Sequence, residues 1–351
     1  MIGIHQRRKM IQRSENISPN AQPVKAVGLL SGGLDSTLAA KIIRDLGIEV
    51  HGVYFAMPWG CCSKADAIRS AESLGINCIV LQLDERYLEI VRKPKYGYGT
   101  ALNPCVDCRI HMFRRAAQYM RHIGADFVFT GEVLGQRPMS QLRHSMKWIE
   151  EGSGLEGRLL RPLCAQALEP TLPEKEGIVD RKKLLQITGR SRKEQLQLAK
   201  DNNITDFSPP TGGCLLTNHH FARRMKDTFE YGYRNFRETI SLKWGRHFRL
   251  NKDFKAILGR DQEENAALRH YAHQEDTILQ LADDLGPTCI LKGANPSDEI
   301  LGIAAGLIQL FSKRSDGPNA QIKYWKNSDK NNVYTVEAMK MSAAEAERIK
   351  I

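Results

Sequence analysis

The sequence contains no long apolar run. None of its hydrophobic stretches approaches the roughly 18 residues that a helix needs to cross a bilayer. Residues 1–24 are polar and basic, and they lack the continuous apolar stretch of a secretory signal. Internal repeats and low-complexity tracts are also absent. We therefore expect a cytoplasmic protein that does not enter membranes, with residues 1–24 forming a flexible basic arm.

Negative charge is the scarcer sign. The chain has 51 lysines and arginines against 40 acidic residues, which gives a formal net charge of +11. Such an excess favours a polyanionic partner, because neutralised phosphates release their counterions. It is equally compatible with a basic surface that only contacts solvent. Charge alone leaves these two interpretations even.

Apolar runs of strand length alternate with helical patterns through the first part of the chain. We expect strands at 25–30, 50–55, 77–83 and 126–130, and helices near 38–46, 63–74, 109–123 and 191–201. This alternation predicts an α/β fold, a doubly wound parallel sheet with right-handed crossovers. We assign it to residues 25–222, with an inserted or mobile loop at 151–190 where prolines interrupt the pattern.

The remainder of the chain changes character. Residues 223–246 combine basic and aromatic side chains and are expected to form a linker helix. Residues 247–351 predict a second, smaller α+β domain. Its strands are expected near 247–250, 254–258, 276–282, 288–292, 320–326 and 332–338, and its helices near 261–272 and 297–312, with a short terminal helix.

A glycine-rich turn connects the first expected strand to the first expected helix. It consists of Ser31, Gly32, Gly33, Leu34, Asp35 and Ser36. Unpaired backbone N–H groups and the helix dipole favour an anion there, and glycines let a phosphate approach closely. Asp35 would repel that anion, so it indicates Mg²⁺ between carboxylate and phosphates, or a hydrogen bond that holds the loop. The alternative is a glycine turn with an incidental helix cap.

This stretch resembles the SGGxDS motif of the PP-loop ATP pyrophosphatases, enzymes that cleave ATP between its α- and β-phosphates and transfer AMP to an oxygen. The resemblance implies an adenine nucleotide α-hydrolase-like fold, bound ATP and Mg²⁺, and a catalytic role for Asp35. It also implies that adenine lies near the end of the second strand, at Phe55, although an aromatic residue there is equally typical of a core.

Eight cysteines in a reducing compartment indicate ligands, nucleophiles or core residues. Cys105 and Cys108 lie at an expected helix start, where the helix N-terminus and nearby Arg109 and Arg114 favour the thiolate. Cys214 follows glycines in an expected loop. The other cysteines are interpreted as packed thiols: Cys61, Cys62, Cys78, Cys164 and Cys289.

Two further stretches, Asn103–Arg114 and Thr130–Gln141, closely resemble the PP-loop domain of tRNA 4-thiouridine synthases and of the related tRNA 2-thiouridylases. The resemblance covers residues 25–217 and includes Pro210–Cys214. It implies nucleotide-binding positions at Gly131 and Gln136, and chemistry at Cys108 and Cys214. Family members with a third cysteine at the Cys105 position are thought to hold an iron–sulfur cluster with all three. The N-terminal RNA-binding THUMP domain usual in 4-thiouridine synthases has no counterpart here.

Three thiolates would leave one iron of a 4Fe-4S cluster without a protein ligand, so that iron could carry sulfide. Two alternatives stay open at this point. One is a persulfide on one cysteine that is attacked by the other. The other is inert thiols or a structural zinc site, with His219 or His220 as a fourth ligand.

The C-terminal part, about 247–340, resembles the NFACT-R domain, a predicted RNA-binding module. The match runs through 257–265, 289–293 and 304–305. Candidate phosphate contacts are Arg223, Arg224, Lys226, Arg246, Arg249, Arg260, Lys292, Lys313 and Arg314. Tyr231, Tyr233, Phe236 and Trp244 could stack on unpaired bases, but we favour packing between domains.

Together these features predict an ATP-dependent tRNA thiouridine synthase, which adenylates a uridine carbonyl oxygen and replaces it with sulfur. The expected partners are tRNA or another RNA and a cysteine desulfurase or sulfide as sulfur donor; a homodimer is left open. One alternative is a PP-loop sulfurtransferase or amide-forming enzyme acting on a small molecule. Another is a non-catalytic RNA- or ribosome-binding protein with a regulatory nucleotide site.

Overall fold

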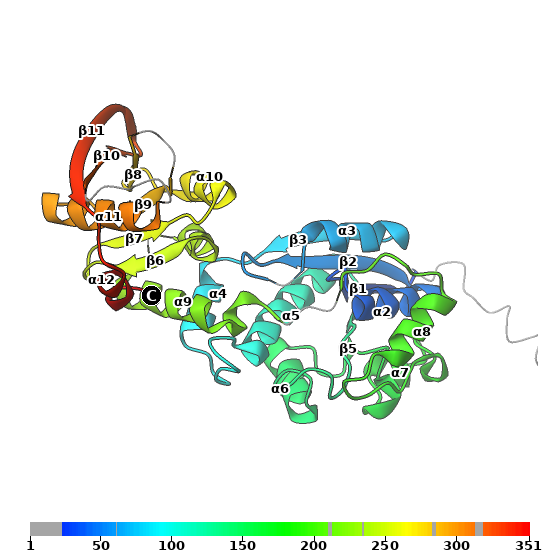
Figure 1. Cartoon of the computed structure of the whole chain (residues 1–351). Helices are drawn as coiled ribbons and strands as arrows, with labels where there is room; N and C mark the ends of the chain where they lie inside the picture. The colour runs from blue at the N-terminus through cyan, green and yellow to red at the C-terminus, as the bar shows by residue number, and fades with distance from the viewer. Residues whose placement is uncertain (1–22, 61, 210–212, 234, 283–285, 313–318) are drawn as a thin grey trace, which may run out of the picture. The chain divides into compact units, whose positions relative to one another are not determined.

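A computed structural model describes residues 23–60, 62–209, 213–233, 235–282, 286–312 and 319–351 (Figure 1). The chain forms two compact units. The first contains Met1–Phe55, Cys62–Leu81 and Arg109–Pro210, and the second contains Ala56–Cys61, Gln82–Cys108 and Thr211–Ile351. Most of the predicted N-terminal arm, residues 1–22, lies outside the described residues.

The first unit is built on a five-stranded sheet in the order β3-β2-β1-β4-β5. The strands are β1 (Lys25–Leu29), β2 (Glu49–Ala56), β3 (Asn77–Gln82), β4 (Phe127–Thr130) and β5 (Leu159–Leu160). β1 pairs in parallel with both β2 and β4, and β4 pairs in parallel with β5. The strand order therefore reverses at β1, and the carboxyl end of β1 and β4 is the place where such sheets bind ligands.

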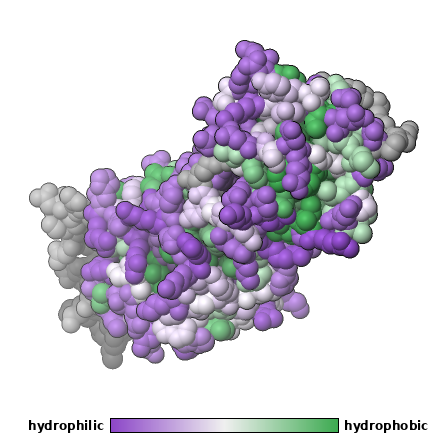
Figure 2. All heavy atoms as spheres, turned by 90° about the vertical axis from the view of Figure 1, so that its left-hand side faces the viewer, coloured by the Kyte–Doolittle hydropathy of each residue, from purple (hydrophilic) through white to green (hydrophobic). Residues whose placement is uncertain are grey.

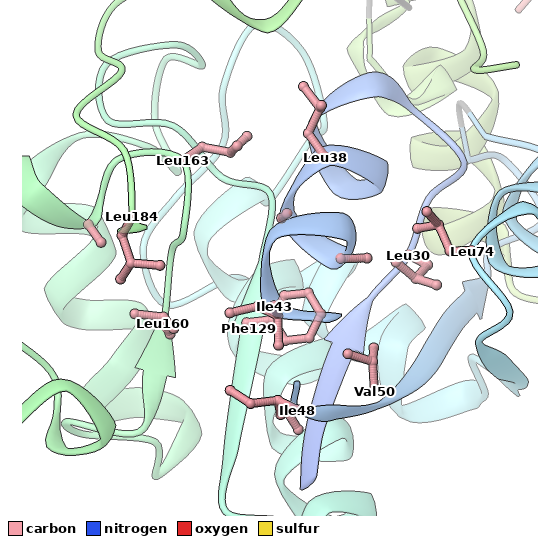
Figure 3. Close-up of a cluster of buried hydrophobic side chains, with 14 of the residues drawn as sticks. Leu30, Leu38, Ile43, Ile48, Val50, Leu74, Phe129, Leu160, Leu163 and Leu184 are labelled. Atoms are coloured by element: carbon pink, nitrogen blue, oxygen red, sulfur yellow. The ribbon is translucent and has the colours of Figure 1, made fainter. Parts of the chain in front are cut away.

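Helices follow the strands of this sheet. They are α2 (Leu34–Asp45), α3 (Lys64–Ser73), α5 (Cys105–His122), α6 (Arg143–Ser153), α7 (Leu172–Lys175) and α8 (Lys193–Asp201), and the first turn of α5 belongs to the second unit. The core lies between helices and sheet: Ile43 of α2 lies beside Phe129 of β4, close to Ile48 and Leu160 (Figure 3). All four of these side chains are buried.

The second unit contains a six-stranded sheet in the order β11-β10-β8-β9-β7-β6, with antiparallel neighbours. Its strands are β6 (Arg246–Arg249), β7 (Lys255–Leu258), β8 (Thr277–Leu281), β9 (Cys289–Lys292), β10 (Asn319–Lys326) and β11 (Asp329–Met339). Its complete helices are α4 (Glu85–Arg92), α9 (His219–Tyr231), α10 (Gln262–Tyr271), α11 (Asp298–Phe311) and α12 (Ala343–Arg348). Short 3-10 turns include Leu215–Thr217 and Phe236–Lys243.

Two apolar clusters hold this second sheet. The apolar residues of α11 pack with Phe248, Leu279 and Ile322 in the larger cluster. A smaller cluster contains Ile257 of β7 and Leu268 of α10, and Trp244 and Trp325 pack against it. Hydrophilic side chains cover much of the face shown in Figure 2, with smaller hydrophobic areas between them.

The structure confirms the predicted fold class, a doubly wound parallel sheet and a second, smaller α+β part. Three helices, α4, α6 and α7, and the short strand β5 were not predicted; α7 and β5 lie in the segment that was expected to be a loop. The single linker helix predicted at 223–246 is wrong, because Gly232 ends α9 and a separate 3-10 turn follows. The domain boundaries at 24, 222 and 246 stay predictions. Among the described residues, no helix combines the length and apolar character needed to span a membrane.

Strands β1 and β4 approach each other closely at Gly28. Gly28 pairs with Phe129, and a Cβ at Gly28 would lie 2.4 Å from Cζ of the Phe129 ring. We expect Gly28→Ala to lower the free energy of unfolding by about 1–3 kcal/mol through overpacking. Urea denaturation should give a smaller loss when the same change is made in a Phe129→Leu background. Equal losses in both backgrounds would contradict this contact as the cause.

Candidate functional site

The glycine-rich turn lies between the end of β1 and the start of α2. Gly32 has φ +74°, and a Cβ there would lie 2.4 Å from the carbonyl carbon of Asp66. Gly33 is the N-cap of α2 and contributes no side-chain hydrogen bond. The hydroxyl of Ser36 donates to the Gly33 carbonyl at 2.9 Å and accepts from the Ser31 N–H at 3.2 Å. These bonds hold the turn while the first N–H groups of α2 have no side-chain cap, as an anion site requires.

Asp35 lies in the first turn of α2. Its Oδ2 accepts a hydrogen bond from Gln136 Nε2 at 3.0 Å, whereas its Oδ1 is buried and has no hydrogen-bond partner among the described residues. Burial raises the pKa of the Asp35 carboxyl, and the Gln136 hydrogen bond and the charges of Arg192 and Arg137 oppose that rise. A buried carboxylate oxygen without a donor fits a cation, so the arrangement is compatible with Mg²⁺.

The end of β4 contacts this first turn directly. A Cβ at Gly131 would lie 2.5 Å from the carbonyl carbon and oxygen of Asp35 and 2.6 Å from the Ser36 nitrogen. Only glycine permits this approach without moving the helix start. The structure thus brings Gly131 and Gln136 to Asp35.

Two predicted nucleotide-binding positions that have apolar side chains are buried. Leu34 is fully buried in the core cluster of the first unit, so its side chain packs and only its backbone is available to a phosphate. Phe55 lies near the carboxyl end of β2 with 9% of its surface exposed. Its contact with adenine stays a prediction.

The three candidate cysteines lie together in the second unit, around a tyrosine. The hydroxyl of Tyr87 in α4 donates to Cys108 Sγ at 3.2 Å, and Asn103 Nδ2 donates to Cys105 Sγ at 3.2 Å. The pKa of Tyr87 is well above its usual range, first because of burial and then because Cys108, Cys214 and Cys105 act on it. Cys108 thus contacts the hydroxyl directly, and Cys105 and Cys214 act on its pKa through their charge.

Trp59 packs against Tyr87 and connects it to the segment that follows Cys214. Its ring stacks on Tyr87 with 6.2 Å between centroids, and it is fully buried. Its carbonyl accepts from the Leu215 N–H at 2.9 Å, which ties down the residue next to Cys214. The Leu102 N–H donates to the Leu216 carbonyl at 3.0 Å, so the segments before Cys105 and after Cys214 are also joined.

The described part of the chain contains no group of three or more His, Cys, Asp or Glu side chains that could hold a metal ion. The zinc alternative gains no support from the histidines, since His220 Nδ1 is hydrogen-bonded to Arg223 at 2.7 Å. Soft thiolates suit iron, but the three sulfurs do not form a recognisable ligand set as they stand. The cluster therefore stays a proposal.

The prediction of packed thiols is confirmed for Cys164 and Cys289 and, at the edge of a core, for Cys78; for Cys62 it stays a prediction. Cys164 and Cys289 are fully buried, and burial raises their pKa to about 11 and about 12. Cys78 packs at the edge of the first core, and Cys62 is half-buried. Cys61 lies outside the described residues. Packed, protonated thiols of this kind are unreactive.

Arg109 and Arg114 have other partners than the thiols they were predicted to activate. Arg114 Nε donates to the Gly152 carbonyl at 2.7 Å. Arg109 pairs with Glu132, which also binds Arg161 in a buried network. Sequence reasoning missed this network, as it missed Tyr87 and Trp59. The sequence carries weak signals for the network and for Tyr87. Charged residues lie just after the apolar strands β4 and β5, and the apolar residues of the short helix α4 recur at helical spacing.

Two family models match separate parts of the chain. Residues 24–147 match the tRNA methyl transferase HUP domain, and residues 245–348 match the NFACT protein RNA binding domain. The first match contains the glycine-rich turn, Asp35, Gly131 and Gln136. The second contains the six-stranded sheet.

The chain is similar to proteins named tRNA-specific 2-thiouridylase MnmA. The one from Sulfurimonas denitrificans is 36% identical over 113 residues, 30% of this chain and 33% of that protein. The one from Tropheryma whipplei is 25% identical over 224 residues, 59% of this chain and 61% of that protein. The chain thus spans less than two thirds of these relatives. A 4-thiouridine synthetase solved with RNA and ATP is 21% identical, with a TM-score of 0.39, over 58% of this chain and 50% of that chain.

Residues 24–147 are thus similar to the HUP domain, and residues 245–348 are similar to the NFACT RNA-binding domain.

Proposed function

We propose that this protein is an ATP-dependent tRNA thiouridine synthase. The observation that supports it most is the thiol site of the second unit, in a chain that also matches a HUP domain. There the Tyr87 hydroxyl donates to Cys108 Sγ, Cys105 lies one turn earlier in α5, and Trp59 joins Tyr87 to the residue after Cys214. Relatives named tRNA-specific 2-thiouridylases support the same reaction class. The tRNA substrate, the sulfur donor and a cytoplasmic location belong to the proposal.

In the first step, a uridine carbonyl oxygen attacks the α-phosphorus of ATP, and pyrophosphate leaves. Backbone N–H groups of the turn and of the α2 start would bind phosphate oxygens, and Asp35 would hold Mg²⁺ beside them. These positive groups stabilise charge that develops on the phosphates. The product is an O-adenylated uridine and pyrophosphate.

In the second step, a sulfur nucleophile attacks the activated carbon, and AMP leaves with the former carbonyl oxygen. The carbon–sulfur bond then remains as the thiocarbonyl. Adenylation is needed because an oxide is a poor leaving group, whereas AMP is a good one. Sulfide, or sulfur delivered by a cysteine desulfurase, supplies the sulfur atom.

We propose that Cys105, Cys108 and Cys214 hold the sulfur carrier. As ligands of a 4Fe-4S cluster they would leave one iron free to bind sulfide. The alternative carrier is a persulfide on Cys108 or Cys214. The thiol of the other cysteine would attack its inner sulfur, which releases sulfide to the activated carbon and forms a Cys108–Cys214 disulfide that an external thiol must reduce before the next cycle. In both cases the Tyr87 hydroxyl and the Trp59 ring orient the Cys108 segment.

Thionucleosides in cellular RNA test the proposed function directly. Mass spectrometry of RNA digests should show the loss of one thiouridine species when the gene is deleted. Wild-type protein and Cys78→Ala should restore it, because Cys78 is a packed thiol, while Cys108→Ala should not. Unchanged levels of every thionucleoside after deletion would refute the proposal.

Iron content distinguishes the two sulfur carriers. Protein purified without oxygen should contain close to four irons and four acid-labile sulfides per chain if the three thiols hold a cluster. Cys105→Ala should then lose most of the iron, and Cys78→Ala should keep it. Full iron in Cys105→Ala would contradict the ligand assignment, and iron-free wild-type protein that still thiolates RNA would favour the persulfide.

Substitution of Tyr87 tests the thiol site without changing any cysteine. Tyr87→Phe keeps the ring on Trp59 and removes only the hydroxyl that binds Cys108 Sγ. Hydrogen bonds to charged groups contribute about 1.5–3 kcal/mol, so we expect thiolation to slow roughly 10- to 100-fold. The matched control is Tyr98→Phe, whose hydroxyl donates to the Val91 and Arg92 carbonyls. Equal rates in the two variants would exclude a role for the Tyr87 hydroxyl.

A further inference from the structure

Three arginines from separate elements gather around the peptide groups of Gly245. Arg224 of α9 donates to the Gly245 carbonyl at 3.0 Å and to the Leu242 carbonyl at 2.9 Å. Arg246 is the next residue in the chain, at the start of β6. Arg260, which follows β7, pairs with Glu264, and Glu264 Oε2 accepts from the Gly245 N–H at 3.1 Å. We call Arg224, Arg246 and Arg260 the Gly245 arginine cluster.

The position of the cluster is set by the backbone. Gly245 has φ +77°, and a Cβ there would lie 2.6 Å from the Leu258 carbonyl oxygen at the end of β7. The glycine therefore holds the start of β6 close to β7. This packing brings Arg224 of α9 and the Arg260–Glu264 pair of the β7–α10 turn to the Gly245 peptide groups, and Arg246 follows in the chain with its side chain over Phe311.

Positive charge in this cluster exceeds negative charge. Glu264 is the carboxylate paired with Arg260, whereas Arg246 stacks over the Phe311 ring at 4.6 Å. Arg224 Nε is buried without a hydrogen-bond partner among the described residues. Burial lowers the pKa of Arg224 to about 10 and also lowers that of Arg246, and the charge of Arg260 adds to both shifts.

Two other predicted phosphate contacts, Arg249 and Lys292, are neutralised within the fold, whereas Lys226 is exposed. Arg249 binds Asp227 at 2.6 Å, and Asp227 also binds Lys255 at 2.8 Å. Lys292 lies 3.1 Å from Glu238 and 3.5 Å from Asp276. Lys313 and Arg314 lie outside the described residues.

We propose that the Gly245 arginine cluster, extended by the exposed Arg223, is the surface on which RNA docks through its phosphodiester backbone. Guanidinium groups bind phosphate oxygens in a bidentate fashion, and like charges held together at a cost in stability indicate an anionic ligand. A polyanion fits better than a small anion, because several elements contribute charge in a protein of net charge +11. The inference rests on the proposed RNA substrate and assigns it a binding surface.

The salt dependence of RNA binding tests this surface. The variant is Arg223→Gln/Arg246→Gln in the full chain, which leaves Arg224 on its carbonyls and Arg260 on Glu264. Fluorescence anisotropy with labelled tRNA should show roughly tenfold weaker binding near 0.1 M salt. The slope of log K against log salt concentration should fall by about 1.5–2, since each lost phosphate contact removes a little under one.

The matched control removes the same charge from the opposite edge of the sheet. Lys326→Gln/Lys330→Gln alters two exposed lysines at the β10–β11 hairpin, and β11 and β6 are the two edge strands (Figure 1). We expect its affinity and slope to match the wild type. Melting temperatures of all proteins confirm that the fold is kept.

Several outcomes would overturn the inference. An unchanged slope in Arg223→Gln/Arg246→Gln, or equal losses in the control, would show that RNA docks elsewhere. Displacement of RNA by inorganic phosphate at matched ionic strength would indicate a small-anion site instead. The proposed function can fail independently of this surface. If the variant loses RNA binding but deletion of the gene changes no thionucleoside in cells, the docking surface is supported and the thiolation reaction is refuted.

Discussion

The first turn of α2 lies against the end of β4 at a distance that only glycine permits. Without the bare Cα of Gly131, the Asp35 carbonyl would meet a side chain at 2.5 Å and the helix start would have to move. This contact fixes the N-terminus of α2 at the reversal of strand order. It also lets Gln136, a few residues later, reach the Asp35 carboxylate. One close approach thus sets both the start of α2, where we propose that phosphate binds, and the Asp35 carboxylate, which we propose binds Mg²⁺.

Regular periodicity made most of the fold predictable. Most strands of both sheets and the helices α2, α3, α5, α8, α10 and α11 follow simple apolar patterns, whereas β5, α6 and α7 do not. Ser31–Ser36 specify the glycine-rich turn through their own backbone. The eight-residue helix α4 was missed because its apolar residues Tyr87, Leu88 and Val91 make too short a pattern to stand out. The roles of Gly131 and Gln136 came only from resemblance, since their contacts join residues about 100 positions apart.

The thiol site also depends on contacts between residues that are far apart in the sequence, which local patterns do not predict. The predicted position of Cys105 and Cys108 at a helix start is confirmed, because helix geometry is local, while their chemical role stays a proposal. The groups that contact them are not local: Tyr87 comes from another helix, and Trp59 ties Leu215 by a backbone bond. Arg109 and Arg114 looked suitable from spacing alone, yet the fold pairs them with Glu132 and the Gly152 carbonyl. Spacing predicts which groups are candidates, and long-range packing selects among them.

The same selection applies to the basic residues of the second unit. This unit has acids to pair with its cations, since Asp227, Glu238 and Asp276 bind Arg249, Lys255 and Lys292. The excess positive charge around Gly245 therefore does not reflect a lack of carboxylates in this unit. It arises because these carboxylates lie elsewhere. Arginines drawn together by a glycine-dependent turn repel one another in the free protein. A phosphate backbone bound there would offset that repulsion, so the local electrostatic cost becomes part of the driving force for RNA binding.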